Sequence, residues 1–129
     1  MIGLDTNVVV RYLTRDNEKQ WQQAVDIIDC SETCFVSNIV LCELFWVLKG
    51  KHYQYSHAEI MQAMELMLQS PKFEFENPSV VYQAIANTRQ GKADFADYLI
   101  GAVNHHYGCL YTATFDRKLK TARRFQVLN

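Results

Sequence analysis

Short apolar runs alternate with longer helix-forming segments along the chain, and this alternation limits the fold more than any other feature. The runs read IGL at 2–4, CFVS at 34–37, KFEFE at 72–76, CLYTAT at 109–114 and FQVL at 125–128. Runs of this length suit strands, and the segments between them are long enough for helices. Strands separated by helices favour βα crossover units and parallel pairing. The sequence therefore predicts an α/β fold with a short, mainly parallel central sheet flanked by helices.

Capping residues and apolar spacing indicate where the helices begin and end. Ser37 can cap a helix that stops at Gly50, and Ser56 with Glu59 matches a capping box. Asn77 before a proline is a further helix start. Helices are therefore expected at 8–13, 18–29, 38–50, 60–68, 79–88 and 93–106, with a basic helix after Asp116.

The length of 129 residues suits one domain, and no repeat, low-complexity tract or linker divides the chain. No stretch approaches the roughly 20 apolar residues that a membrane-spanning helix needs. The N-terminus lacks a basic region and carries Asp5 within its apolar run, so no signal peptide is expected. We therefore expect a single domain over residues 1–129, located in the cytoplasm and without membrane contact. There the four cysteines, which form no CxxC pair, would stay reduced.

Charge is distributed unevenly, although the formal net charge is only −1. Residues 117–129 carry five cations and no acid, whereas the first 116 residues carry 8 cations and 14 acids, a balance of −6. A basic tail beside an acidic body can hold a phosphate backbone next to carboxylates. A solvated helix face explains the same cations equally well.

Four carboxylates fall where a parallel α/β sheet would gather them. Asp5 ends the first expected strand, and Asp116 follows the fourth. Glu43 interrupts an almost wholly apolar helix, which implies a buried carboxylate, and Asp97 lies near the start of another helix. In open α/β sheets, sites form at the carboxyl ends of strands. Carboxylates that meet there repel one another, and a hard divalent ion such as Mg²⁺ or Mn²⁺ relieves that repulsion.

Each acid also has a structural role open to it. Asp5 and Asp116 can cap the helices that follow them, and Glu43 can lie at an exposed gap or in a buried ion pair. Asp94 and Asp97 fit the two acidic positions of a capping box. Helix positions three apart lie within roughly 60° of each other, so capping and metal binding do not exclude each other. We assign Asp97 to the metal and Asp94 to the cap, with an outer-shell or second-metal role also open to Asp94.

Four motifs resemble, in order and spacing, those of PIN-domain ribonucleases, most closely the VapC-type toxins of bacterial toxin–antitoxin pairs. They are LDTNVVVRYL, CELFWVL, DFADYLIGAV and TATFDRKL. The resemblance covers essentially the whole chain and implies a PIN-like three-layer sandwich. It also implies a Mg²⁺- or Mn²⁺-dependent endoribonuclease in which Asp5, Glu43, Asp97 and Asp116 are the catalytic, metal-binding acids. Asp94 matches an additional acid that only some members carry.

In the reaction that the resemblance implies, a divalent ion stabilises charge on the scissile phosphate and activates water, so no histidine base is needed. The candidates for orienting the carboxylates or the water are Thr6, Asn7 and Thr114, each of which also suits a turn or a cap. The candidates for RNA phosphate contacts are Arg11, Arg117 and Lys118, for which surface solvation is the alternative.

The resemblance further implies an RNA substrate, a small antitoxin protein over the acidic groove, and a homodimer or a higher toxin–antitoxin complex. Two other functions are compatible with the residues. One is a non-catalytic PIN-like module that binds RNA or protein, against which the intact set of acids argues. The other is a phosphatase with Asp5 as nucleophile, although that class needs a second aspartate where this chain has Asn7.

Overall fold

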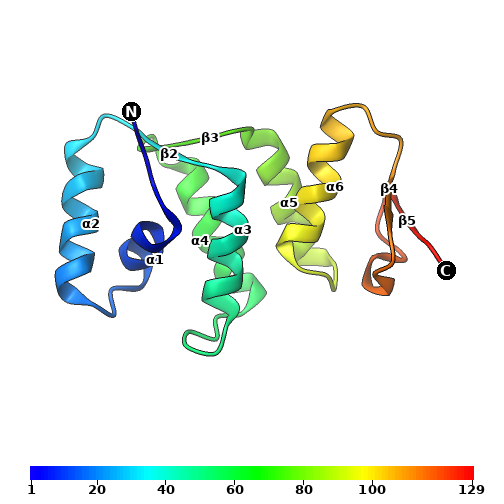
Figure 1. Cartoon of the computed structure of the whole chain (residues 1–129), viewed down its shortest axis with the longest axis horizontal. Helices are drawn as coiled ribbons and strands as arrows, with labels where there is room; N and C mark the ends of the chain where they lie inside the picture. The colour runs from blue at the N-terminus through cyan, green and yellow to red at the C-terminus, as the bar shows by residue number, and fades with distance from the viewer. The chain divides into compact units, whose positions relative to one another are not determined.

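The computed structural model describes all 129 residues and contains six α-helices, one 3₁₀ turn and five short strands (Figure 1). Every strand pairing in it is parallel, which confirms the expected α/β class. The chain forms two compact units, Met1–Pro78 and Ser79–Asn129. The prediction of one domain over 1–129 stays a prediction. None of the helices combines the length and the apolar composition that crossing a bilayer requires.

The first unit contains a three-stranded sheet in the order β1-β2-β3 and four helices. Its strands are β1 (Ile2–Gly3), β2 (Cys34–Val36) and β3 (Phe73–Phe75). Its helices are α1 (Thr6–Thr14), α2 (Glu18–Cys30), α3 (Asn38–Lys49) and α4 (His57–Gln69). Helix α1 packs against both α2 and α3. The first strand therefore leads directly into a helix that is fixed by two neighbours.

The helix starts of the first unit follow the predicted capping. The hydroxyl of Ser37 accepts a hydrogen bond from the backbone N–H of Val40 at 3.2 Å. Ser56 and Glu59 form the complete capping box, with reciprocal hydrogen bonds of 3.1 and 2.9 Å. These bonds satisfy N–H groups that a helix leaves without intrahelical partners. Both predicted caps are confirmed.

The second unit holds a two-stranded parallel sheet with two helices. The elements are α5 (Pro78–Gln90), of which the unit takes all but Pro78, α6 (Phe95–His106), β4 (Thr112–Thr114), the 3₁₀ turn η1 (Arg117–Leu119) and β5 (Phe125–Val127). Thr112 pairs with Phe125 at the start of the two strands. Buried side chains of both helices, among them Ile85, Phe95 and Leu99, form its core.

The strand expected at 109–114 is wrong in its first half, because residues 107–109 end helix α6 instead. The backbone N–H of Cys109 donates to the carbonyl of Asn104 at 3.0 Å, and that of Gly108 donates to His105. Gly108 has a φ of 90°, the left-handed conformation with which glycine terminates helices. With its N–H committed to the helix end, Cys109 cannot begin the strand, which starts at Thr112.

The basic helix expected after Asp116 is also wrong, since only the single turn η1 forms there. The segment between β4 and β5 must return to the start of β4, because the two strands are parallel and in register from Thr112 and Phe125. A longer helix would carry the chain away from that pairing. The cations of this segment are therefore held on turns and not along one helix face.

Candidate active site

Asp5 stands between β1 and α1 and is the N-cap of the helix. Its Oδ1 accepts a hydrogen bond from the backbone N–H of Thr6 at 2.9 Å, and its carbonyl accepts from Val8. The carboxylate is exposed. The capping role that the sequence left open is therefore present, and solvent access leaves the second carboxylate oxygen available to other ligands.

Thr6 connects Asp5 to Glu43. Its side chain is buried, 7% exposed, and its hydroxyl donates to Oε1 of Glu43 at 2.7 Å. The same residue thus binds one acid through its backbone N–H and the other through its hydroxyl. Asp5, Thr6 and Glu43 are called here the first acidic set.

The expectation that Glu43 is buried is wrong, because α3 is not covered on all sides. Glu43 is exposed, and Ile39 and Trp46 on the same helix are 72% and 54% exposed. Spacings of four and three residues place these side chains on one face of α3. The apolar residues of this face made the helix look buried from its sequence. Glu43 lies at the exposed gap that was the structural alternative.

Asp94 and Asp97 form the predicted capping box at the start of α6. Asp94 is the N-cap, and Oδ2 of Asp97 accepts a hydrogen bond from the backbone N–H of Asp94 at 3.2 Å. Both side chains are half-buried. The box uses one oxygen of Asp97 and leaves the other without a role in the cap.

Burial raises the pKa of Asp97 above its usual value of 3.8, and the negative charges of Asp116 and Asp94 add to the rise. The hydrogen bond from the Asp94 backbone and the positive charge of Lys118 act in the opposite direction. The raised pKa of Asp97 therefore reflects first its burial and then the two acids near it. Asp94, Asp97 and Asp116 are called here the second acidic set.

Asp116 is fixed by two local hydrogen bonds after β4. Its backbone N–H donates to the hydroxyl of Thr114 at 3.1 Å, and its Oδ1 accepts from the backbone N–H of Lys118 at 2.9 Å. The aspartate caps η1, as the sequence allowed, and it is half-buried. Thr114 thus helps to set the backbone that carries the acid.

The carboxylates fit a hard divalent ion in their chemistry. All donors of both sets are oxygen atoms, which Mg²⁺ and Mn²⁺ prefer, and the repulsion felt by Asp97 is of the kind that a cation relieves. No group of three or more His, Cys, Asp or Glu side chains has the spacing to hold a metal ion. The assignment of Asp5, Glu43, Asp97 and Asp116 to one ion therefore stays a prediction.

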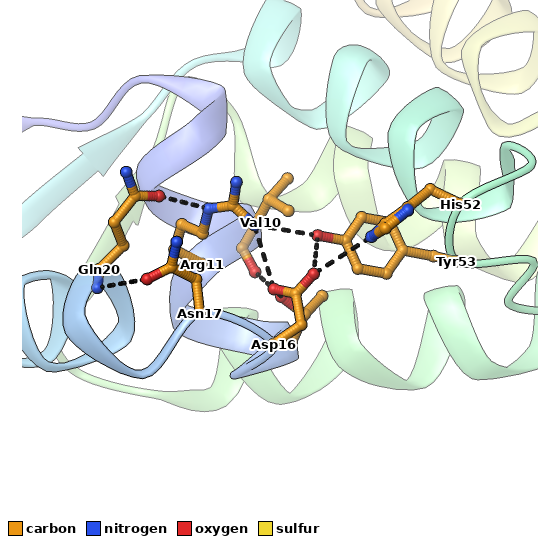
Figure 2. A network of polar contacts seen from close by, with 8 residues as sticks. Val10, Arg11, Asp16, Asn17, Gln20, His52 and Tyr53 are labelled. Atoms are coloured by element: carbon orange, nitrogen blue, oxygen red, sulfur yellow. Dashed lines mark hydrogen bonds and ion pairs between the residues drawn. The ribbon is translucent and has the colours of Figure 1, made fainter.

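Arg11 lies in a polar network that sequence reasoning missed (Figure 2). Its Nε donates to Gln20 at 2.6 Å and its Nη1 to Asp16 at 3.1 Å. Asp16 also accepts from the hydroxyl of Tyr53 at 2.8 Å and lies 3.3 Å from a ring nitrogen of His52. The Tyr53 hydrogen bond is the main cause that lowers the pKa of Asp16 to about 2. No local motif signals a network whose members lie so far apart in sequence.

The remaining candidates occupy the surface. Arg117 and Lys118 are exposed on η1, and the charge of Lys118 reaches Asp97. Asn7 is exposed on α1 and, with Arg11 and Gln20, lines a cavity of about 320 Å³. Whether these side chains contact RNA stays a prediction. To contact RNA, Arg11 would have to break or share its hydrogen bonds to Gln20 and Asp16.

Comparison with known proteins identifies one family. The PIN domain description matches residues 2–124, a range that contains both acidic sets. Among solved structures, the chain is similar to the crystal structure of Mycobacterium tuberculosis VapC20, a sarcin-ricin loop cleaving toxin. The two share 18% sequence identity over 96% of each chain, with a TM-score of 0.45. No curated protein matches significantly.

Proposed function

Since the chain belongs to the PIN-domain family, we propose that it is a Mg²⁺- or Mn²⁺-dependent endoribonuclease and the toxin of a type II toxin–antitoxin pair. The observation that carries the proposal is the second acidic set, in which burial and then the charges of Asp116 and Asp94 raise the pKa of Asp97. A protein gains no stability by gathering acids in this way. Such a cluster is instead typical of a site built to receive a cation.

We assign the metal-binding, catalytic role to Asp5, Glu43, Asp97 and Asp116, with Asp94 as the cap and an additional acid. A divalent ion, when bound, neutralises the scissile phosphate and lowers the pKa of the attacking water. Thr6 orients Glu43 through its hydroxyl, and Thr114 supports the backbone of Asp116. Arg117 and Lys118 are proposed to contact RNA phosphates, which positions the strand without reading its sequence.

The partners follow from the same proposal. We expect a small antitoxin protein to cover the acidic groove and a homodimer, or a higher toxin–antitoxin complex, to form in the cytoplasm. The motifs of the VapC type support this part of the proposal. We expect a short reading frame beside the gene. Its product should co-purify with the chain.

Cleavage of RNA by the purified chain tests the catalytic proposal. Activity should disappear with EDTA and return with Mg²⁺ or Mn²⁺, and Asp5→Asn and Asp97→Asn should each abolish it. Asp29→Asn, the same substitution at an exposed acid outside both sets, is the matched control and should cleave normally. Full activity in the Asp5 and Asp97 variants would disprove the mechanism. Metal-independent RNA binding without cleavage would instead favour the non-catalytic module.

A further inference from the structure

The second unit contains a cavity of about 540 Å³ that the proposed catalytic residues do not line. Its lining residues come from α5, from α6 between Tyr98 and His106, and from the segment that leads into β5. Its volume falls within the roughly 300–1,000 Å³ of sites that bind small ligands. The lining residues that the argument uses are Gln83, Asn87, Tyr98, Gly101, Arg124 and Phe125, together with Arg123, His105 and His106.

The charge of this cavity is opposite to that of the acidic sets. Arg123, Arg124, His105 and His106 line it, and no aspartate or glutamate does. An arginine side chain presents a planar fork of donors that matches the oxygens of a phosphate. In a chain whose net charge is −1, a cavity lined by two adjacent arginines and no acid is suited to an anion.

The basic end of the cavity lies away from the acids of the second unit, whereas Tyr98, which lines the cavity's other end, directly follows Asp97. Asp97 is in the first turn of α6, and His105 is about 12 Å further along the axis at 1.5 Å per residue. Arg124 precedes β5 and its carbonyl accepts from Thr112, the first residue of β4, whereas Asp116 follows the end of β4. A phosphate on Arg123 and Arg124 would therefore bind at a different place from the second acidic set.

One wall of the cavity is aromatic and depends on a glycine. The rings of Tyr98 and Phe125 meet edge to face with centroids 6.4 Å apart. A Cβ on Gly101 would lie 2.4 Å from the Phe125 ring, so only glycine lets that ring rest on α6. Tyr98 is buried behind this wall and supports the ring of Phe125, which is only half-buried. An accessible aromatic ring can pack against a nucleobase whatever its sequence.

Polar groups on α5 complete the lining. Gln83 and Asn87 lie one turn apart, and the amide of Gln83 donates to that of Asn87 at 3.3 Å. The pair offers further donors and acceptors of the kind that hydrogen-bond to base edges or ribose hydroxyls. The cavity thus combines an anion-binding group, an aromatic wall and amide groups, which together match the parts of a nucleotide.

The backbone of Arg124 supports a role for its side chain. Its φ is 67°, in the left-handed region that glycine or asparagine adopts more easily than arginine. The conformation is held by the hydrogen bond of 2.8 Å from Thr112 to the Arg124 carbonyl. The fold of the unit thus fixes the backbone that carries the Arg124 side chain, which lines the cavity.

We propose that this cavity binds one nucleotide of a single-stranded RNA, with the phosphate on Arg123 and Arg124 and the base beside Phe125. The choice of RNA as the source of the nucleotide rests on the proposed ribonuclease function. A free nucleoside monophosphate has the same chemistry, and the experiment separates the two. Occupation of the cavity would anchor the substrate strand at a second point, away from the carboxylates.

The test measures binding of a short, fluorescently labelled single-stranded RNA by anisotropy, with EDTA present so that no cleavage occurs. Arg123→Gln/Arg124→Gln should weaken binding about tenfold or more. It should also reduce the slope of log affinity against log salt by about 0.7, because the two arginines share one phosphate and each phosphate neutralised on a single strand contributes about 0.7. Lys19→Gln/Lys120→Gln removes two exposed cations outside the cavity and is the matched control, with wild-type affinity expected. Circular dichroism confirms that each variant is folded.

A second arm titrates ¹⁵N-labelled protein with adenosine 5′-monophosphate and follows the amide signals of Gly101 and Arg124. These signals should shift in the wild type and stay fixed in the double arginine variant. Equal RNA affinity in the wild type and that variant overturns the proposal. If the mononucleotide nevertheless shifts the Gly101 signal, the cavity takes free nucleotides and not RNA. Arginine-dependent RNA binding by a chain that never cleaves RNA would refute the ribonuclease function and leave this site intact.

Discussion

Asp94 and Asp97 share one capping box but differ in what surrounds them. Asp94 begins the helix, whereas Asp97 lies one turn in, where the charges of Asp116 and Lys118 reach it. Burial and the two neighbouring acids raise the pKa of Asp97. Asp94 is therefore assigned to the cap. Asp97 is assigned to the metal, because a bound cation would relieve its repulsion from Asp116 and Asp94.

Alanine at these two positions should have unequal effects. We expect Asp97→Ala to abolish RNA cleavage and Asp94→Ala only to weaken it, while the latter costs about 1 kcal/mol of stability as a lost cap. Cleavage rates and urea denaturation of the two variants, measured side by side, check this. Equal loss of cleavage would show that both acids bind the ion.

Asp16 should make the stability of the fold depend on pH in a narrow acidic window. Its pKa falls from 3.8 to about 2 on folding, so the carboxylate stabilises the fold above about pH 4. That contribution is lost as the pH falls from about 4 towards 2. The stability gap between the wild type and Asp16→Asn should therefore be full at pH 5 and should shrink in that window.

Tyr53→Phe provides the internal check, because the Tyr53 hydroxyl is the largest cause of the lowered pKa. It should raise the pKa of Asp16 towards its ordinary value and reduce the same pH dependence. Urea denaturation at a series of pH values measures both variants. A gap between the wild type and Asp16→Asn that is as wide at pH 2.5 as at pH 5 would contradict the assignment.

At the scale of elements, local signals in the sequence predicted much of the structure. Caps such as Ser37, Ser56 and Asp94 act within three residues of themselves, and the helices that they begin are all present. The errors lie where distant pairing decides. Cys109 helps to end helix α6 and does not begin a strand. The helix expected after Asp116 is reduced to one turn by the parallel register of β4 and β5.

The local surroundings of the candidate site residues could also be predicted from the sequence, whereas their contacts with distant residues could not. Sequence motifs pointed to all four acids, and the capping roles of Asp5, Asp97 and Asp116 were among the readings kept open. The exposure of Glu43 was missed because an apolar helix face looks buried when its neighbours are unknown. The bond between Thr6 and Glu43 joins residues 37 positions apart, and no local pattern announces it.

The end of α6 offers a prediction about element boundaries. Gly108→Ala should destabilise the fold by about 1–2 kcal/mol, because its φ of 90° is left-handed while a Cβ there would meet nothing within 4 Å. The cost is thus one of backbone conformation alone. Gly3→Ala, where a Cβ is equally uncrowded and φ is not left-handed, is the control and should be neutral or slightly stabilising. Urea denaturation of both variants measures the difference, and equal stabilities would contradict the role of Gly108.

For the whole molecule, each compact unit carries one acidic set, and metal binding can be tested on the intact chain. An ion that binds only the folded chain stabilises it by mass action, by about 2.7 kcal/mol at one hundred times its dissociation constant. This stabilisation can be measured without substrate, so it tests metal binding separately from catalysis.

We therefore expect Mn²⁺ to raise the midpoint of thermal unfolding by several degrees over an EDTA sample. Asp5→Asn and Asp97→Asn should each remove most of this shift, whereas Asp29→Asn should keep it. Differential scanning fluorimetry across a range of Mn²⁺ concentrations measures all four proteins. An acid whose variant retains the full shift does not bind the ion.

Thr6 binds Asp5 through its backbone N–H and Glu43 through its hydroxyl. This division suggests a way to make an inactive form of the protein. Removing an acid changes the charge that an antitoxin or an RNA would meet, so such a variant is an imperfect substitute for the native surface. Valine at position 6 has nearly the shape of threonine, and it deletes only the hydroxyl that holds Glu43. If Thr6→Val proves inactive in the cleavage test, it would keep every charge of the native chain and would suit structural work on the complexes proposed here.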